Sequence, residues 1–259
     1  MNFIYEWPIV ATVALILALS IAATELGFRY GIRERVDRSD RDFAMTTGLK
    51  ASIIGLVALL LGFSFSITSS RFSERTRIVM EEANTISTCY DRAGLVAEPA
   101  RGQIRDALRR YTVIRIDYFK NALDDAAFAR TSADMNVALA ELWSGVTKAV
   151  QADPQLANTS QIVAGANEVM DIAEMREWSM LNRLPASVVV LLAVCMVISG
   201  ALVGHSSAEA GERHPGLWIA LNVLIMLVVF VILDFDRPRR GLIQISQRPL
   251  VEVLEEMRR

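Results

Sequence analysis

The sequence predicts an all-α membrane protein with four transmembrane helices and a helical insert between the second and the third. Of its 259 residues, 53% are hydrophobic, and the mean hydropathy is +0.33, which is too apolar for an ordinary soluble domain. The apolar residues are concentrated in four runs, which cover residues 8–26, 51–69, 186–203 and 217–233. Each run is near the ~17–25 residues that cross a bilayer as a helix.

The four runs have the character of membrane spans. The segment before the first run, MNFIYEW, contains no Lys or Arg, and the run is long for a signal peptide, so we expect a transmembrane helix there. Apart from Glu25 near the end of the first run, no run contains Asp, Glu, Lys, Arg or His. Pumps and ion-coupled carriers usually need such groups at depth, so the sequence argues against both classes.

The polar segment between the second and third runs is expected to be helical. Apolar residues recur there at helical spacing, as at Ile104, Leu108 and Tyr111, and no strand-like alternation is present. Prolines break the pattern after Glu98 and Asp153, since a residue before proline avoids the α region. The predicted helices cover residues 72–96, 100–123, 125–151 and 155–184. Because no turn signal separates them from the apolar runs, we expect the first and last to continue the second and third spans.

Basic residues near the runs predict the orientation. Four spans put both termini and the insert on one side, which carries nine arginines near the membrane, against seven basic residues on the other. Basic residues are enriched on the cytoplasmic side. We therefore predict spans one and two in residues 1–71, a cytosolic helical domain in residues 72–184, spans three and four in residues 185–236, and a cytosolic tail in residues 237–259.

Small residues follow one side of the second run, at steps of four and three. Seven of the eight positions in this small-residue stripe are Gly or Ser: Gly48, Ser52, Gly55, Leu59, Gly62, Ser66, Ser69 and Ser73. Such a stripe lets helices pack closely, or it lines a water-filled pore with hydroxyls and exposed backbone. Both interpretations hold if several copies surround one axis. Since no other run carries a comparable stripe, we expect a homo-oligomer.

Two motifs resemble the bestrophin ion-channel family, and in particular the bacterial membrane proteins called bestrophin-like. The first is Leu61-Gly62-Phe63, with an Arg-aromatic pair eight residues on, at Arg71-Phe72. The second is the segment DFDRPRRGLIQISQRPL after the fourth run, in which an acidic residue, a proline and a glycine follow one another. These are Asp236, Pro238 and Gly241.

The resemblance implies a passive ion channel in the bacterial inner (plasma) membrane. It implies a homo-oligomer, with a pentamer favoured, in which the second span lines a pore for inorganic ions. The residues that we expect to line this pore are Gly55, Leu59, Gly62, Phe63 and Ser66. Leu59 and Phe63 are one turn apart and would stack as apolar rings. The family's calcium clasp needs an acidic cluster, for which Asp234 and Asp236 are too few, so we expect no metal and no cofactor.

Several charged and polar residues have two interpretations. Arg71, Arg237, Arg239 and Arg240 are expected at an interface or as anchors to lipid head groups, the alternative being anion binding.

Glu81, Glu82 and Asn84 would form a polar ring around an axis, the alternative being a solvated helix face or salt bridges to Arg75 or Arg77. Asn222 is expected to hydrogen-bond a neighbouring helix. His205 and His214 have no metal-ligand partners at suitable spacing, and we expect them to be solvated.

The sequence excludes other classes of function. A net charge of −2 implies no attraction to nucleic acid. No nucleophile–base pair, phosphate loop or metal cluster is present, so we do not expect an enzyme. The two cysteines, Cys89 and Cys195, are expected to be unpaired. The alternative to a channel is a membrane-anchored sensor or scaffold without a pore, whose four-helix domain binds a ligand or partner.

Overall fold

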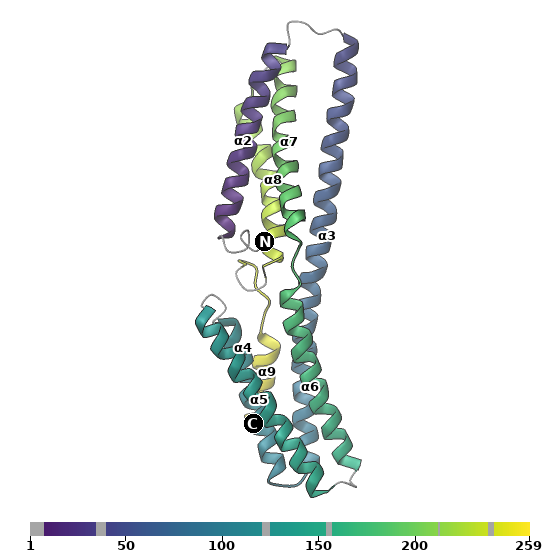
Figure 1. Ribbon diagram of the computed structural model, residues 1–259, viewed down its shortest axis with the longest axis vertical. Coiled ribbons are helices and arrows are strands. Elements are labelled where there is room, and N and C mark those ends of the chain that lie inside the picture. Colours follow the sequence, from purple (N-terminus) through teal and green to yellow (C-terminus); the bar gives the residue numbers. More distant parts are fainter. Residues whose placement is uncertain (1–7, 35–39, 121–124, 154–156, 212, 238–240) are drawn as a thin grey trace. The chain divides into compact units, whose positions relative to one another are not determined.

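The computed structural model describes residues 8–34, 40–120, 125–153, 157–211, 213–237 and 241–259. Within these ranges the chain is helical and has no strand (Figure 1). The helices are α2 (Ile9–Glu34), α3 (Asp40–Arg92), the short 3-10 helix η2 (Ala93–Leu95), α4 (Ala100–Lys120), α5 (Asp125–Ala152), α6 (Ala157–Leu181), α7 (Ala186–Ala210), α8 (Pro215–Phe235) and α9 (Arg248–Glu256).

Four of the described stretches are long and apolar enough to cross a membrane. They are Ile9–Glu34, Thr47–Leu95, Thr159–Ala210 and Pro215–Phe235. Each contains one of the predicted apolar runs almost completely. The predicted class, an all-α protein with four transmembrane helices and a helical insert, is therefore confirmed.

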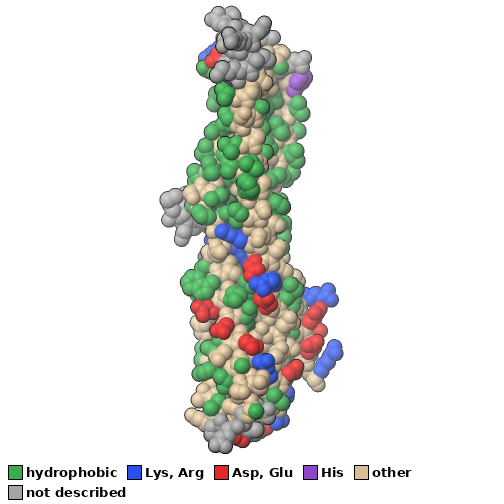
Figure 2. Space-filling model, turned by 90° about the vertical axis from the view of Figure 1, so that its right-hand side faces the viewer, with side chains coloured by type: hydrophobic (Ala, Val, Ile, Leu, Met, Phe, Trp, Pro, Cys, Tyr) green, Lys and Arg blue, Asp and Glu red, His purple; other side chains and the backbone are tan. Residues whose placement is uncertain are grey.

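The chain folds into two compact units. The membrane unit comprises Met1–Arg71 and Arg183–Arg237, and the insert unit comprises Phe72–Asn182 and Pro238–Arg259. In Figure 2, apolar side chains cover the visible face of the membrane unit, whereas acidic and basic side chains are scattered over the insert unit. This contrast is expected of one unit surrounded by lipid and another surrounded by water.

The membrane unit is held together by an apolar core and by close packing of α2 against α7. The core takes residues from α2, α3, α7 and α8, among them Ile16, Leu61, Met196 and Val229. The backbones of α2 and α7 meet at glycines. A Cβ on Gly204 of α7 would lie 1.8 Å from the Thr24 carbonyl oxygen. A Cβ on Gly27 of α2 would lie 2.1 Å from the Ala201 carbonyl oxygen.

These distances allow only glycine at both positions. Adding a single methyl group there is therefore expected to lower the stability of the membrane unit considerably. Gly204→Ala is expected to destabilise the membrane unit by about 1–3 kcal/mol or more, because backbone atoms rather than a flexible side chain block the new Cβ. Gly216→Ala is the matched control, since its Cβ would meet nothing within 4 Å. Thermal unfolding of both variants in detergent is the measurement. Equal midpoints for the two would contradict the close approach of α2 and α7.

Helices extend further beyond the apolar runs than the sequence predicted. The first apolar run ends at residue 26 and the second begins at residue 51, but α2 continues to Glu34 and α3 begins at Asp40. Likewise α7 continues to Ala210. The reason is that polar residues are compatible with a helix once it leaves lipid, and i,i+4 ion pairs support it. One such pair joins Arg29 Nε to Glu25 Oε1 at 2.8 Å.

The two predicted continuations differ in outcome. α3 runs without a break from Asp40 to Arg92, as expected for the second span. The expectation that the last helix of the insert continues into the third span is wrong, because α6 ends at Leu181 and α7 begins at Ala186. Pro185 has extended geometry, with φ −56° and ψ 137°, and lacks the N–H that a helix needs. Arg75 donates to the terminal carbonyls of Ser179, at 3.0 Å, and Asn182, at 2.8 Å.

The insert unit is a helical bundle with the C-terminal helix packed on it. The predicted inward residues Ile104, Leu108 and Tyr111 are fully buried. The helices around them agree with the predicted ranges to within a few residues. Leu250 and Val253 of α9 belong to the same core. Together these contacts make the C-terminal helix part of the insert unit rather than a separate tail.

Candidate functional site

One face of α3 packs inside the membrane unit. Val57, Leu61, Ser64 and Thr68 are each less than 10% exposed. They recur at steps of four and three, so they form one side of the helix. Val57 and Leu61 join the apolar core with residues of α7 and α8. The hydroxyl of Thr68 donates to the Ser64 carbonyl oxygen at 2.9 Å, which satisfies it without a partner from another helix.

The opposite face of α3 is exposed, and it carries the small-residue stripe. At 100° per residue this face lies about 180° from the buried one. A Cβ built on Gly48, Gly55 or Gly62 would meet nothing within 4 Å. The candidate pore residues Gly55, Leu59, Gly62, Phe63 and Ser66 are all exposed in the single chain.

Glycines in the other helices serve a different purpose. We expected that no other apolar run carries a stripe of small residues comparable to that on α3. This expectation was wrong for α2 and α7. Gly27 and Gly31 of α2 lie against the backbone of α7, and Gly200 and Gly204 of α7 lie against α2. These two sets cover each other. The stripe on α3 therefore remains without a counterpart among the described residues of its own chain.

The two sequence motifs meet in the membrane unit. Arg71 Nη1 lies 3.7 Å from Asp236 Oδ1, and the same oxygen accepts a hydrogen bond from the Leu184 N–H at 2.8 Å. The carboxylate of Asp236 thereby joins α3, the end of α8 and the connection between α6 and α7. Arg237 is buried, at 7% exposure. Arg239 and Arg240 lie outside the described residues, so their predicted role as anchors stays a prediction.

Asn222 bonds its neighbours inside the membrane unit, as expected. Its amide nitrogen donates to the Trp218 carbonyl oxygen at 2.8 Å, and its amide oxygen accepts from the hydroxyl of Ser20 on α2. Ser20 also lies 3.0 Å from the Met196 carbonyl oxygen on α7. The three polar groups join α2, α7 and α8, which is the usual role of a buried amide in a membrane bundle.

A buried charge cluster stabilises the insert unit. Glu82, Arg115 and Arg176 are each at most 1% exposed. Glu82 Oε1 accepts from Arg115 Nε at 2.7 Å and from the Tyr111 hydroxyl at 2.5 Å. Its other oxygen pairs with Arg176, which also bonds Gln247 next to α9. The cluster connects α3, α4, α6 and the C-terminal segment.

The cluster shifts the pKa values of its members in ways that fit its geometry. Burial disfavours ionisation of Glu82, but the two guanidiniums and the phenol outweigh it and hold the pKa of its carboxyl below the usual value. Burial raises the pKa of the Tyr111 hydroxyl well above its ordinary value, and the Glu82 charge adds to that effect. Glu82 is thus a charged acceptor and Tyr111 a neutral donor.

Sequence reasoning missed this cluster. Glu82 was expected in a polar ring or in a surface pair, and its burial contradicts both. Glu81 does form the surface pair with Arg77. The available signal was Arg115, which occupies an inward position of α4 next to Tyr111 where an apolar residue would be expected.

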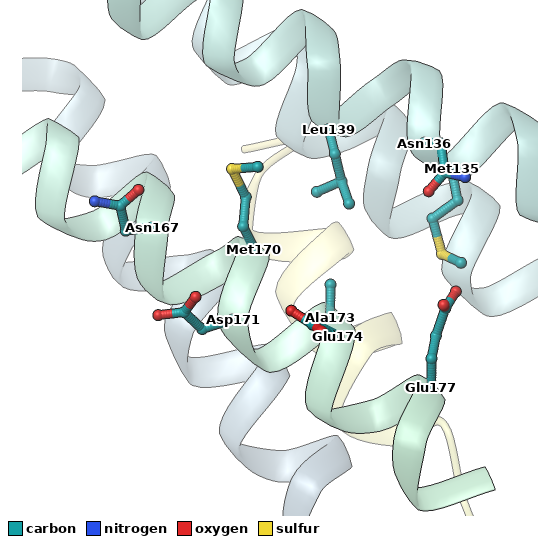
Figure 3. Close-up of a pocket in the computed structure, with 9 residues that line it drawn as sticks. All are labelled: Met135, Asn136, Leu139, Asn167, Met170, Asp171, Ala173, Glu174 and Glu177. Atoms are coloured by element: carbon teal, nitrogen blue, oxygen red, sulfur yellow. The ribbon is translucent and has the colours of Figure 1, made fainter. Parts of the chain in front are cut away.

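A groove between α5 and α6 is one of the surface hollows of the insert unit. Its volume is about 360 Å³. Figure 3 shows Met135, Leu139 and Met170 beside the acidic Asp171 and Glu174. Among the described residues, no group of three His, Cys, Asp or Glu side chains is arranged to hold a metal ion. Cys89 and Cys195 are both free and buried.

Comparisons with known proteins identify a family and a fold. A family model described as the bestrophin-like domain matches residues 14–250. Crystal structures of variants of a bacterial bestrophin homolog from Klebsiella pneumoniae share the fold. One has a TM-score of 0.70 at 13% identity and covers 96% of this chain and 97% of that chain. Another has a TM-score of 0.68 at 12% identity, with 96% and 99% covered. At these identities the likeness shows the fold alone. A comparison with the curated proteins found no match.

Proposed function

Because this chain belongs to the bestrophin-like family, we propose that it is a passive ion channel in which α3 lines the pore of a homo-oligomer. The motifs resemble those of bestrophin ion channels, and the fold is that of a bacterial bestrophin homolog. The proposal places the protein in the bacterial inner membrane as a multi-pass protein, with the insert unit in the cytosol. It assigns the protein no catalytic activity and no cofactor.

The observation that carries this proposal is the exposed stripe on α3. Small polar residues and open glycines on a membrane helix are unfavourable toward lipid, since their backbone and hydroxyl groups gain nothing from hydrocarbon. The chain's own helices cover the opposite face of α3 instead. Copies of α3 around one axis would direct the stripe toward each other and toward a shared lumen.

Such a ring would have a defined profile. Leu59 and Phe63 are 54% and 60% exposed in the single chain, and they would form two apolar rings one turn apart. Apolar rings resist wetting and close a pore without charge. Gly55 on one side and Ser66 on the other would leave wider, hydrated vestibules. Ions would cross by diffusion, because the span of α3 offers no ionisable side chain for coupled transport.

The subunit number tests the ring. The purified protein in mild detergent is expected to be a homo-oligomer, with five copies favoured by the family resemblance. Native mass spectrometry measures this directly against a chain mass of 28.7 kDa. A stable monomer under conditions that keep the helices folded would contradict both the ring and the pore.

A monomer would favour the second candidate, a membrane-anchored sensor or scaffold without a pore. The observation that supports it is the groove between α5 and α6, whose methionines and carboxylates suit a small ligand with apolar and basic parts. The groove does not explain the stripe on α3, and we therefore prefer the channel.

A further inference from the structure

Four titratable side chains from three helices meet at the end of the membrane unit where α2 ends. Lys50 of α3 places its Nζ 2.9 Å from His205 Nδ1 and 2.5 Å from Glu209 Oε2, both on α7. His205 Nε2 lies 3.2 Å from Glu34 Oε2 on α2. The side chains of Lys50, His205 and Glu209 are only 12%, 13% and 8% exposed. The expectation that His205 is solvated is therefore wrong.

The contacts define the protonation pattern of His205. A lysine ammonium is only a donor, so the 2.9 Å contact fits a neutral imidazole whose Nδ1 accepts and whose proton lies on Nε2. That proton then points to the carboxylate of Glu34. The ring of Tyr30 on α2 lies beside the imidazole, with centroids 6.1 Å apart. Tyr30, Glu34, Lys50 and Glu209 are titratable groups that lie beside His205, and they come from α2, α3 and α7.

Lys50 anchors the N-terminal part of α3 to the rest of the unit. It lies seven residues before Val57, two turns along the same face of the helix, and this face also carries Leu61. Val57 and Leu61 are held by apolar packing. N-terminal to these two residues, the same face is held by Lys50 through two polar contacts to α7. A change at His205 or Glu209 therefore acts directly on α3.

We propose that His205 and Lys50 form a proton-responsive tie between α3 and α7. Protonation turns His205 Nδ1 from an acceptor into a donor, and two donors then face each other at the 2.9 Å contact. The new N–H has an alternative acceptor in Glu209 Oε1, which lies 3.5 Å away. His205 then competes with Lys50 for the Glu209 carboxylate. Lys50 loses one partner and shares the other, and the N-terminal part of α3 is released from α7.

The tie also gives the channel a way to respond to acid on the side of the membrane that carries the ends of α2 and α7. This consequence rests on the proposed function, because it requires that α3 lines a pore. The tie itself does not rest on conduction and is tested without it.

Hydrogen exchange of α3 tests the tie in the intact oligomer. Amides of residues 47–56 are compared at about pH 7.5 and about pH 5.5, on either side of an ordinary imidazole pKa, after correction for the intrinsic exchange rate. In the wild type these amides are expected to exchange roughly tenfold faster at the lower pH, the effect of losing one charge-assisted hydrogen bond. Residues 57–68, held by apolar packing, are the internal control and are expected to stay unchanged.

Two variants separate titration from packing. His205→Gln keeps one donor and one acceptor but does not titrate, so its exchange is expected to be independent of pH. Lys50→Gln removes the tie and is expected to exchange rapidly at both pH values. A wild type without a pH response, or a His205→Gln variant that responds like the wild type, would overturn the proposal. Vesicles that carry no ion flux at either pH would contradict the channel function alone, because exchange needs no conduction.

Discussion

Replacing Phe63 by alanine is expected to raise ion leak through reconstituted vesicles severalfold. In a ring of α3 helices, Phe63 provides the bulkiest apolar constriction. Its removal leaves Leu59 as the one remaining apolar ring among the proposed pore residues. A wider, less apolar neck is wetted more easily, and a wetted neck conducts. Flux from vesicles loaded with an ion-sensitive dye measures the effect, with the oligomeric state checked in the same preparation.

Phe65→Ala is the matched control. It removes the same side chain from a position two residues on, about 200° around the helix from Phe63. Phe65 packs near the ring of Phe235, with centroids 6.2 Å apart. General loosening of the bundle should therefore appear in this variant at least as strongly. If Phe63→Ala leaves flux unchanged in a well-folded oligomer, or if both variants leak equally, the apolar neck on α3 is wrong.

Glu82→Gln is expected to destabilise the insert unit by about 3–5 kcal/mol, the usual cost of removing one partner from a buried ion pair. The variant removes the carboxylate that the buried guanidiniums of Arg115 and Arg176 share. It also weakens the link to Gln247, through which the C-terminal segment is held. Denaturant unfolding of the purified oligomer, followed by a signal from the insert unit, gives the change in free energy.

Glu81→Gln provides the comparison for this prediction. It is the same substitution on the neighbouring residue of the same helix, but Glu81 pairs with Arg77 at the surface, where both side chains are more than 40% exposed. Exposed pairs contribute about 0–1 kcal/mol. Similar losses for the two variants would mean that the buried cluster is not the source of the stability that we assign to it.

The sequence was sufficient for most of the fold because its signals are local. Four long apolar runs and the helical periodicity around Leu108 each depend on residues a few positions apart, and the structure follows them. The break between α6 and α7 was also encoded locally, by Pro185, but the flanking apolar residues concealed it. The first helix is longer than its apolar run, because α2 continues with polar residues after the run ends at residue 26.

The candidate site was only partly predictable for the opposite reason. The stripe on α3 is a pattern within one helix, and the structure leaves it exposed. By contrast, Glu82 meets Arg115 and Arg176 across 33 and 94 residues of sequence. Each of these charges, viewed alone on an amphipathic helix, resembles a solvated residue. The same applies to His205, whose partner Lys50 lies 155 residues away.

Cysteine accessibility along α3 tests the central claim, that this helix lines an ion pathway. The native Cys89 and Cys195 are buried and are replaced first. Gly55→Cys, Gly62→Cys and Ser66→Cys are then treated with a water-soluble, charged thiol reagent during a flux measurement. The account predicts rapid reaction and block of flux at these three positions. At Ile54→Cys it predicts neither reaction nor block. Ile54 is exposed in the single chain but lies off the stripe, on a side of the helix that the account places against lipid. Reaction at Ile54 with none at the stripe, or reaction at the stripe without any effect on flux, would contradict a pore lined by α3.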